Sequence, residues 1–220
     1  MQRLRKPPYL QIALDEPDIE ASKQVIERLP RSGKIIIEAG TLLIKRYGTR
    51  VLNDLRIAAK NRFLVADMKT LDAAKFEVDL AHEGTADAVV AAGLAHRKTL
   101  DTFIREAKRL RMCAAVDMLN VEDPVGKLRS LQELPDIVIL HRGIDQEAET
   151  PHGFELIPAV REVFRGRKLL IAVAGGIVPE TAGDALQMGA DIIIVGRYVT
   201  QSSDVGRAVK ILLRAMLKRS

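Results

Sequence analysis

The sequence predicts an α/β fold, a single (β/α)₈ TIM barrel, and three observations lead to this prediction. Short runs rich in β-branched residues recur about every 25 residues along the 220-residue chain. Segments with the apolar spacing of helices separate these runs, and each strand–helix unit is too short to be a domain. No linker, low-complexity tract or block of charge divides the chain, so residues 1–220 are expected to form one domain.

Eight strands are expected from the β-rich runs. Open doubly wound sheets are the alternative arrangement, and they usually carry a Gly-rich turn after the first strand. Leu14, Asp15 and Glu16 stand at that place here, which favours the closed barrel. The predicted strands cover Leu10–Leu14, Ile35–Ile37, Phe63–Ala66, Ala88–Ala91, Met112–Val116, Ile137–Leu140, Leu169–Val173 and Ile192–Val195.

Eight helices are expected between and after the strands. Their apolar residues recur every three or four positions, as Phe76, Leu80 and Ala81 do. One helix begins after the N-cap Asp123, with Pro124 at its first position. The predicted helices cover Ile19–Leu29, Asp54–Lys60, Ala73–Glu83, Thr99–Leu110, Asp123–Glu133, Leu156–Phe164, Pro179–Met188 and Asp204–Lys218.

The composition argues against several classes of protein. No apolar run approaches the roughly 18 to 20 residues of a membrane span, and the basic start of the chain has no apolar signal region behind it. The lone cysteine, Cys113, lies in an apolar run and is expected in the core, which suits a reducing cytoplasm. The net charge of +5 comes from lysines and arginines that are interleaved with glutamates and aspartates along the chain, and tryptophan is absent. No nucleic-acid partner is therefore expected. A mild positive field would still attract small anionic substrates.

Polar residues and glycines follow seven of the eight predicted strands. The densest group, Asp67-Met68-Lys69-Thr70-Leu71-Asp72, places two acids and a lysine after an apolar strand. Reacting groups of (β/α)₈ barrels lie at the carboxyl ends of the strands. A single acid there is often only a helix N-cap, but a ring of such residues indicates an active site. The strand ends carry Asp15, Glu38, Asp67 with Lys69, Ala91 to Gly93, Asp117, His141, Gly175 with Gly176, and Gly196 with Arg197.

The last two strand ends indicate a phosphate site. Gly175 and Gly176 remove side chains just before a helix, so backbone N–H groups can approach an anion. Gly196 repeats this feature, and Arg197 adds a guanidinium that can bind phosphate through two hydrogen bonds. Barrels often hold phosphate with the loops after strands seven and eight. Two tight turns selected only for their geometry are the alternative.

Glu38 and Asp67 form a candidate magnesium site. Two neighbouring carboxylates repel each other unless a cation is present, and Mg²⁺ prefers oxygen ligands. Lys69 can oppose negative charge that develops on a substrate oxygen. His141 suits a proton shuttle because an imidazole titrates near neutral pH, and a purely structural role is the alternative. Asp72 is either a further site residue or a first-turn acid of the next helix.

The motif Asp67-x-Lys69-x-x-Asp72 resembles the orotidine monophosphate decarboxylase superfamily. Within it, five segments are similar to the 3-hexulose-6-phosphate synthase family, in collinear order over essentially the whole chain. The segment from Glu38 to Thr41 is much more specific than the Asp-x-Lys-x-x-Asp motif alone. The five segments are Leu10–Asp15, Glu38–Thr41 with Ile44 and Lys45, Ala66–Thr70, Val173–Ile177 and Gly196–Arg197.

Two relatives of that family differ at identifiable positions. Orotidine monophosphate decarboxylase carries a lysine where Glu38 stands. 3-Keto-L-gulonate-6-phosphate decarboxylase, the alternative, tends to carry Glu, Arg and Thr where this chain has Asp117, Ile144 and Ala174. The chain also departs from the synthase pattern in the Gly93–Thr99 loop and at Leu42, Tyr47, Ala74 and Arg142. None of these departures removes an expected site residue.

The resemblance implies a Mg²⁺-dependent lyase of the aldolase type. Its expected substrates are D-ribulose 5-phosphate and formaldehyde, which it would join, or release in reverse, through an enediolate. The resemblance also implies that Glu38 and Asp67 hold Mg²⁺, that His141 moves the C1 proton and that Lys69 stabilises the enediolate.

Further implications concern the remaining acids and the assembly. Asp15 and Asp117 belong to the expected catalytic group, and Asp72 is expected to reach the site of a neighbouring subunit in a homodimer. A non-catalytic barrel that binds sugar phosphates is the alternative of another class. Whether a longer protein carries a further fused domain stays open at this point.

Overall fold

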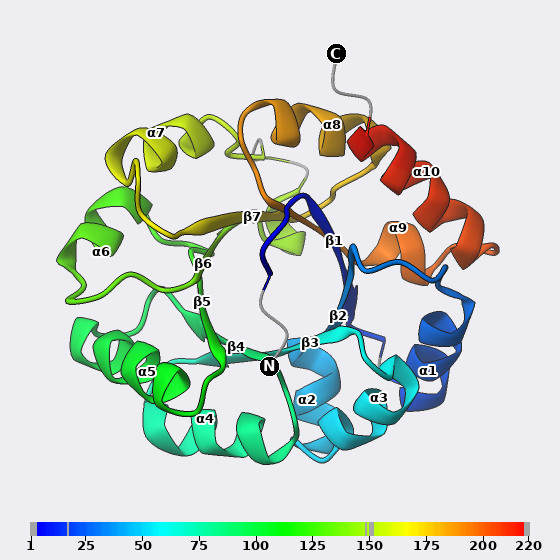
Figure 1. The fold of residues 1–220 in the computed structure, drawn as a ribbon, viewed down its shortest axis with the longest axis horizontal. Coiled ribbons are helices and arrows are strands. Elements are labelled where there is room, and N and C mark those ends of the chain that lie inside the picture. The colour runs from blue at the N-terminus through cyan, green and yellow to red at the C-terminus, as the bar shows by residue number, and fades with distance from the viewer. Residues whose placement is uncertain (1–3, 17, 148, 150–151, 218–220) are drawn as a thin grey trace.

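The computed structural model describes residues 4–16, 18–147, 149 and 152–217. Within them, eight parallel strands close into a barrel that a ring of helices surrounds (Figure 1). Each strand pairs with the next one in sequence, and β8 pairs with β1, which confirms the predicted (β/α)₈ fold. The strands are β1 (Tyr9–Leu14), β2 (Ile35–Ala39), β3 (Phe63–Thr70), β4 (Ala88–Ala92), β5 (Cys113–Asp117), β6 (Ile137–His141), β7 (Leu170–Ala174) and β8 (Ile192–Val195).

The helices lie outside the barrel and return the chain to the start of the next strand. A short 3₁₀ helix, η1 (Ile144–Gln146), follows β6. The α-helices are α1 (Ile19–Arg28), α2 (Thr41–Tyr47), α3 (Val51–Ala59), α4 (Ala74–Glu83), α5 (Arg97–Arg109), α6 (Pro124–Ser130), α7 (Leu156–Val163), α8 (Pro179–Gln187), α9 (Arg197–Thr200) and α10 (Val205–Leu217).

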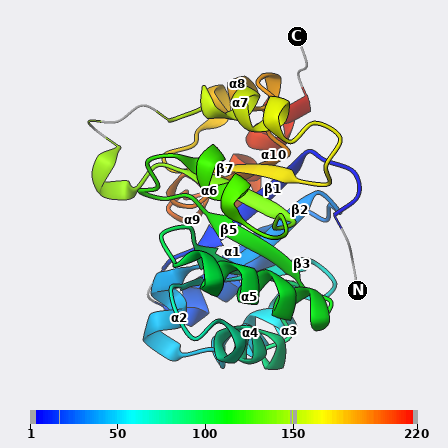
Figure 2. The ribbon, with the colours of Figure 1, turned by 90° about the vertical axis from the view of Figure 1, so that its left-hand side faces the viewer.

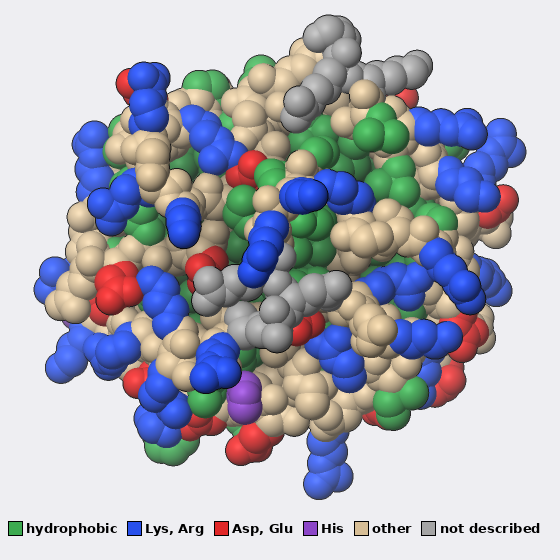
Figure 3. All heavy atoms as spheres, in the orientation of Figure 1, with side chains coloured by type: hydrophobic (Ala, Val, Ile, Leu, Met, Phe, Trp, Pro, Cys, Tyr) green, Lys and Arg blue, Asp and Glu red, His purple; other side chains and the backbone are tan. Residues whose placement is uncertain are grey.

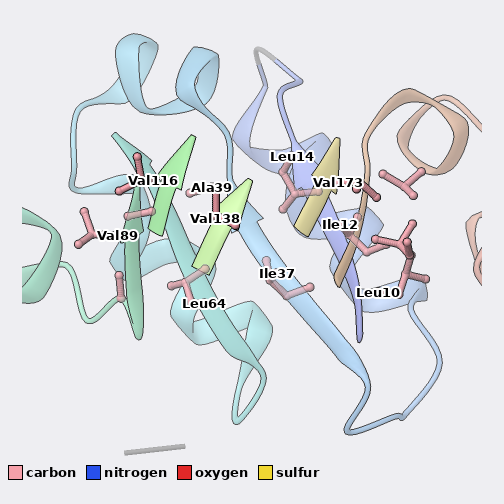
Figure 4. Packing of buried hydrophobic residues seen from close by; sticks show 14 of the residues in the cluster. Leu10, Ile12, Leu14, Ile37, Ala39, Leu64, Val89, Val116, Val138 and Val173 are labelled. Atoms are coloured by element: carbon pink, nitrogen blue, oxygen red, sulfur yellow. The ribbon is translucent and has the colours of Figure 1, made fainter. Parts of the chain in front are cut away.

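The strands are apolar along their length because both of their faces are buried. Side chains alternate between the helices and the barrel interior, since the side-chain period of a strand is two residues. Figure 4 shows outward-facing residues such as Leu10, Ile12 and Leu14, which belong to the large core between strands and helices. The inward-facing residues form a second cluster inside the barrel, which includes Ile36, Val65, Ala115, Ile139 and Ile194.

Three aspartates fix the register at the amino ends of the strands. Asp87, Asp136 and Asp191 directly precede β4, β6 and β8. The side chain of each accepts a hydrogen bond from a backbone N–H near the start of the preceding strand, at 2.8–2.9 Å. Its own backbone N–H donates to the carbonyl of the same residue. The repeated contact ties each of these strand pairs at the end opposite the predicted site.

Several predicted boundaries were wrong. Between β2 and β3 the sequence predicted one helix, over Asp54–Lys60, but the structure has two, α2 and α3. They are separate because Gly48 ends α2 with a φ of +68°. The prediction also missed the four-residue helix α9. The helix predicted to reach Glu133 ends at Ser130, and the predicted end of the last helix, Lys218, lies outside the described residues.

The two ends of the barrel differ. In Figure 2, α2 and the yellow-green η1 segment lie at one end, and the blue segment that precedes β1 lies at the other. Figure 3 shows a face on which lysine and arginine side chains are spread around the rim among acidic ones. No helix within the described residues is long and apolar enough to cross a membrane.

Candidate active site

Strand periodicity places the predicted site residues inside the barrel mouth. Each of four polar residues stands two positions after an inward-facing apolar residue, so its side chain also points inward. Three of the four are acids with under 10% of their surface exposed. The four are Glu38 at the end of β2, Asp67 in β3, Asp117 at the end of β5 and His141 at the end of β6.

The carboxylate of Asp117 joins three elements. Its Oδ2 lies 2.8 Å from Nδ1 of His141 and 2.8 Å from Nζ of Lys69, and its Oδ1 accepts a hydrogen bond from the backbone N–H of Leu119. Burial opposes ionisation, but the hydrogen bond of His141, the positive charge that its imidazole carries when protonated, and the charge of Lys69 outweigh it and lower the pKa of Asp117 to about 2. Asp117 is therefore an ionised acceptor at neutral pH.

Lys69 bridges two of the acids. Besides Asp117, its Nζ contacts Oδ2 of Asp67 at 2.7 Å. Burial disfavours the ammonium form, but Asp67 and Asp117 outweigh burial and raise the pKa of Lys69 above its ordinary value. The prediction that β3 ends at Ala66 was wrong, because the strand continues to Thr70 through an irregular register. Lys69 has a φ of +48° within this irregular stretch, which turns its side chain toward the barrel mouth.

Glu38 and Asp67 interact electrostatically. Burial, followed by the charges of Asp67 and Asp15, raises the pKa of Glu38 to about 8. Gln11, an inward-facing residue of β1, donates a hydrogen bond to Oε2 of Glu38. Thr41 donates to Oδ2 of Asp67 at 2.7 Å. Glu38 is therefore protonated near neutral pH unless a cation stabilises its charge.

The chemistry of these two acids fits a divalent cation. Oδ1 of Asp67 is buried and has no hydrogen-bond partner among the described residues. An unpartnered carboxylate oxygen beside a second carboxyl group is a favourable ligand for Mg²⁺, with water and substrate oxygens as the other ligands. Within the described part of the chain, no group of three or more His, Cys, Asp or Glu side chains could enclose a metal ion alone.

Asp15 interacts with the acid cluster through its charge and with α2 through a hydrogen bond. The backbone N–H of Leu42 hydrogen bonds to its carboxylate, near the start of α2. Burial and the charge of Asp67 raise the pKa of Asp15, although Lys69 and this hydrogen bond oppose the rise. A Cβ on Gly40 would lie 2.1 Å from Oδ1 of Asp15, so the glycine makes room for this carboxylate. The Asp15 side chain thus lies where the acid cluster meets the start of α2.

The predicted phosphate residues meet at the ends of β7 and β8. Gly175 has a φ of +101°, and a Cβ on it would lie 2.0 Å from the carbonyl oxygen of Arg142. Gly176 has a φ of +63°. Glycine is required at this turn for both conformation and space. Gly196 and Arg197 begin α9, and the Arg197 guanidinium is half exposed.

The sequence did not indicate two residues that also lie here. Nη2 of Arg197 is 2.5 Å from both carboxylate oxygens of Glu147. Arg142 donates to the carbonyl of Gly175 at 3.1 Å and to that of Glu147 at 3.3 Å. No motif marks Glu147, because only the folded chain brings it to Arg197 from 50 residues away. Arg142 departs from the synthase pattern, but that departure did not mark it as a site residue.

Asp72 does not join the other predicted site residues within one chain. It lies after β3, before the start of α4, and is exposed. Ala73, the N-cap residue of α4, follows it with a left-handed backbone conformation. The remaining predicted groups, Asp15, Glu38, Asp67, Lys69, Asp117 and His141, interact with one another directly or through their charges.

These features define a (β/α)₈ barrel with a candidate active site of acids, a lysine and a histidine at the carboxyl ends of its strands. Residues 8–212 match the orotidine 5′-phosphate decarboxylase / HUMPS family, and the chain belongs to that family.

Three known proteins illustrate the likeness. The chain is 49% identical over 205 residues to the bifunctional enzyme Fae/Hps of Methanothrix thermoacetophila, covering 93% of this chain and 52% of that protein. It is 45% identical over 217 residues to the bifunctional enzyme Fae/Hps of Methanocella arvoryzae, covering 98% and 55%. The chain thus spans about half the length of these relatives. The crystal structure of 3-hexulose-6-phosphate synthase from Salmonella typhimurium has a TM-score of 0.87 at 29% identity, covering 96% of this chain and 100% of that one.

Proposed function

We propose that the chain is a 3-hexulose-6-phosphate synthase, which joins D-ribulose 5-phosphate and formaldehyde in an aldol reaction or catalyses the reverse cleavage. The observation that carries this proposal is the shared carboxylate of Asp117, which holds Lys69 and His141 together beside Glu38 and Asp67. An aldol reaction through an enediolate needs a base for a carbon-bound proton and positive charge near the developing oxyanion. The likeness to a synthase of known structure and to the Fae/Hps enzymes supports the same activity.

His141 is the proposed base. Because Asp117 is ionised, it accepts a hydrogen bond from Nδ1 of His141, which leaves the lone pair of a neutral imidazole on Nε2. The His141 side chain is 21% exposed, enough for Nε2 to meet a substrate at the barrel mouth. His141 would take the proton from C1 of ribulose 5-phosphate, and Asp117 would stabilise the imidazolium that forms.

Lys69 is the proposed electrostatic stabiliser of the enediolate. Its two carboxylate partners keep it charged, so it is a poor proton donor and a permanent cation. A fixed ammonium group in a partly buried site stabilises negative charge on a substrate oxygen without reorganisation of solvent. The nucleophilic carbon of the enediolate would then attack formaldehyde.

Mg²⁺ is the proposed cofactor, held by Glu38 and Asp67. When bound, it would act as a Lewis acid that polarises the substrate ketone. Gln11 and Thr41 orient the two carboxyl groups from β1 and α2, and the remaining oxygen of Asp67 is available as a ligand. These orienting hydrogen bonds correspond to the outer contacts that usually fix metal ligands.

Gly175, Gly176, Gly196 and Arg197 are the proposed phosphate subsite. They come from the ends of β7 and β8, whereas Glu38 and Asp67 come from β2 and β3, so β1 separates the two groups and Asp67 on β3 stands opposite β7. A substrate anchored by its phosphate at one side would place its ketone end near the acids, Lys69 and His141.

Two apolar residues favour the synthase over the related decarboxylase. Ala174, paired with His141 across β6 and β7, presents a buried methyl group where that decarboxylase tends to carry threonine. Ile144 is 57% exposed and offers no charge where that enzyme tends to carry arginine. A substrate carboxylate would therefore find no cation at this position.

The decisive experiment compares the two reactions. The protein with Mg²⁺ is incubated with ribulose 5-phosphate and formaldehyde, and formaldehyde loss is followed. A parallel reaction with 3-keto-L-gulonate 6-phosphate is followed by release of CO₂. We expect Mg²⁺-dependent formaldehyde loss that Lys69→Ala abolishes. Faster CO₂ release would instead assign the decarboxylase, and no turnover of either would leave a binding protein.

We further propose a homodimer in which Asp72 serves the partner's site. Asp72 is exposed and stands outside the network of its own chain. Large apolar side chains are exposed on neighbouring elements around β3, namely Leu42, Leu71, Phe76 and Leu94, each more than half exposed. Exposed apolar residues at this density are typical of a subunit interface.

A further inference from the structure

The carboxylate of Glu147 lies in the proposed phosphate subsite. Nη2 of Arg197 contacts Oε1 and Oε2 of Glu147 equally, at 2.5 Å. A Cβ on Gly176 would lie 2.4 Å from Nη2 of Arg142 and 3.1 Å from Cδ of Glu147, so this guanidinium and this carboxylate both lie against the glycine turn. The Arg197 guanidinium that would bind an anion thus already faces an anion of the protein itself, and the same carboxylate lies, together with Arg142, against the space at Gly176.

The position of Glu147 is fixed by several contacts. It directly follows η1, where Gly143 donates to Oε1 of Gln146 at 3.2 Å and Gln146 donates to Asn120 at 2.9 Å. Arg142 donates to the carbonyl of Glu147 and, with its other terminal nitrogen, to the carbonyl of Gly175. The Glu147 side chain is 23% exposed and the Arg197 side chain is 49% exposed, so solvent reaches the ion pair mainly from the Arg197 side.

We propose that Glu147 is an internal competitor for the phosphate group and so sets the affinity of this subsite, an inference that rests on the proposed function. A guanidinium binds a carboxylate and a phosphate through the same pair of N–H donors. A phosphate at Arg197 must therefore displace Glu147 or lie beside its negative charge. Either event costs free energy, so Glu147 raises the dissociation constant of phosphate and of phosphorylated substrates.

The consequence is a weaker and more readily released phosphate. Because the competing carboxylate is attached to the chain, its effective concentration does not change with that of the substrate. The enzyme would thus keep a Michaelis constant above the value that Gly176 and Arg197 would allow alone. Product, which carries the same phosphate group, would leave faster for the same reason.

The test measures binding of inorganic phosphate by isothermal titration calorimetry, which requires no turnover. Glu147→Gln removes the charge and keeps the shape, and we expect the dissociation constant of phosphate to fall about tenfold. Glu149→Gln is the matched control, because it removes the same charge from an exposed position two residues away, and should change the constant less than about twofold. A gain in affinity is not what a merely damaged structure produces.

Further arms separate this inference from the proposed function. Glu147→Asp, a second variant that retains the charge but shortens the side chain, should give a smaller gain. With ribulose 5-phosphate, Glu147→Gln should lower the Michaelis constant. An unchanged or higher phosphate dissociation constant in Glu147→Gln would overturn the inference even if the synthase is active. A tenfold gain in an enzyme that consumes no formaldehyde would support the inference and refute the synthase.

Discussion

At the residue scale, one carboxylate determines the chemistry of two neighbours. Asp117 accepts from both Lys69 and His141 through a single oxygen, while its other oxygen is bound by backbone. Its low pKa follows from these two partners, and as an ionised acceptor it would leave Nε2 of His141 available for the proposed role as base. The roles assigned to Lys69 and His141 therefore depend on the same buried acid.

The base can be tested without completing the aldol reaction. His141→Ala should slow exchange of the C1 proton of ribulose 5-phosphate with deuterium oxide by about 100-fold or more, because the proton acceptor is lost. Proton NMR without formaldehyde measures this exchange. His96→Ala, a variant of the N-cap residue of α5, is the control. Undiminished exchange in His141→Ala would refute its role as the base.

If Glu38 is a ligand of Mg²⁺, as proposed, the affinity for Mg²⁺ should depend on pH. In the metal-free protein its pKa of about 8 lies above the ordinary value of 4.5. Between these values the folded state keeps a proton that the unfolded state has lost, so the Glu38 contribution to the free energy of unfolding falls as pH rises. Mg²⁺ binding requires the carboxylate, so it competes with this proton and should strengthen up to about pH 8.

Thermal unfolding with and without Mg²⁺ checks this expectation. The rise in Tm on adding Mg²⁺ should be larger at about pH 8.5 than at about pH 6, because a smaller fraction of the Glu38 carboxyl groups carries a proton that Mg²⁺ must displace. Glu38→Gln should remove most of this difference, since an amide has no proton to lose in this range. An equal rise in Tm at both pH values would count against Glu38 as a ligand.

At the element scale, the two ends of the strands have different tasks. The carboxyl end of β3 is irregular, and holding Lys69 in the left-handed region costs about 1–3 kcal/mol for a residue that is not glycine. The amino ends carry the repeated contacts of Asp87, Asp136 and Asp191, which stabilise regular pairing. Stability is thus concentrated opposite the reacting groups, as is common in this fold.

The strand-start aspartates can be tested by unfolding. Asp136→Ala should lower the free energy of unfolding by about 1.5–3 kcal/mol, because the backbone N–H of Ala114 loses a charged acceptor. Urea unfolding followed by circular dichroism measures the change. Asp145→Ala, on the exposed η1, should stay within about 0.5 kcal/mol of the unmodified protein. Equal effects of the two substitutions would contradict the assigned role of Asp136.

At the scale of the whole molecule, the proposed homodimer predicts active sites to which both chains contribute. Asp72→Asn and Lys69→Ala should each be inactive alone, whereas random reassociation of the two should restore about a quarter of the full activity. The reason is that half of the dimers are mixed, and each mixed dimer has one intact site. Formaldehyde consumption after mixing and brief dissociation measures this recovery.

A matched mixture separates shared from unshared sites. Asp67→Asn and Lys69→Ala both alter the same chain's contribution to a site, so mixed dimers contain no intact site and should stay inactive. Recovery in the Asp72 mixture alone would support the dimer with crossed acids. Absence of recovery in both mixtures, with dimers present by sedimentation, would place Asp72 in its own site or outside the chemistry.

Sequence periodicity determined the barrel and most of its mouth. Eight apolar runs separated by helices allow few topologies, and the period of two within a strand directs Glu38, Asp67, Asp117 and His141 to the same interior. The helix ends were less predictable, because glycines such as Gly48 end helices through backbone conformation and not through hydrophobic pattern. These parts depend on local rules that a sequence displays.

Tertiary structure alone decided which of the charged side chains pair with one another. The contact of Lys69 with Asp117 joins β3 to β5, and the contact of Arg197 with Glu147 joins residues 50 positions apart. Neither partner can be read from spacing, since closure of the barrel brings distant strand ends together. The sequence thus determined which residues reach the mouth of the barrel, and the fold decided their pairing, because burial and distance set their charges.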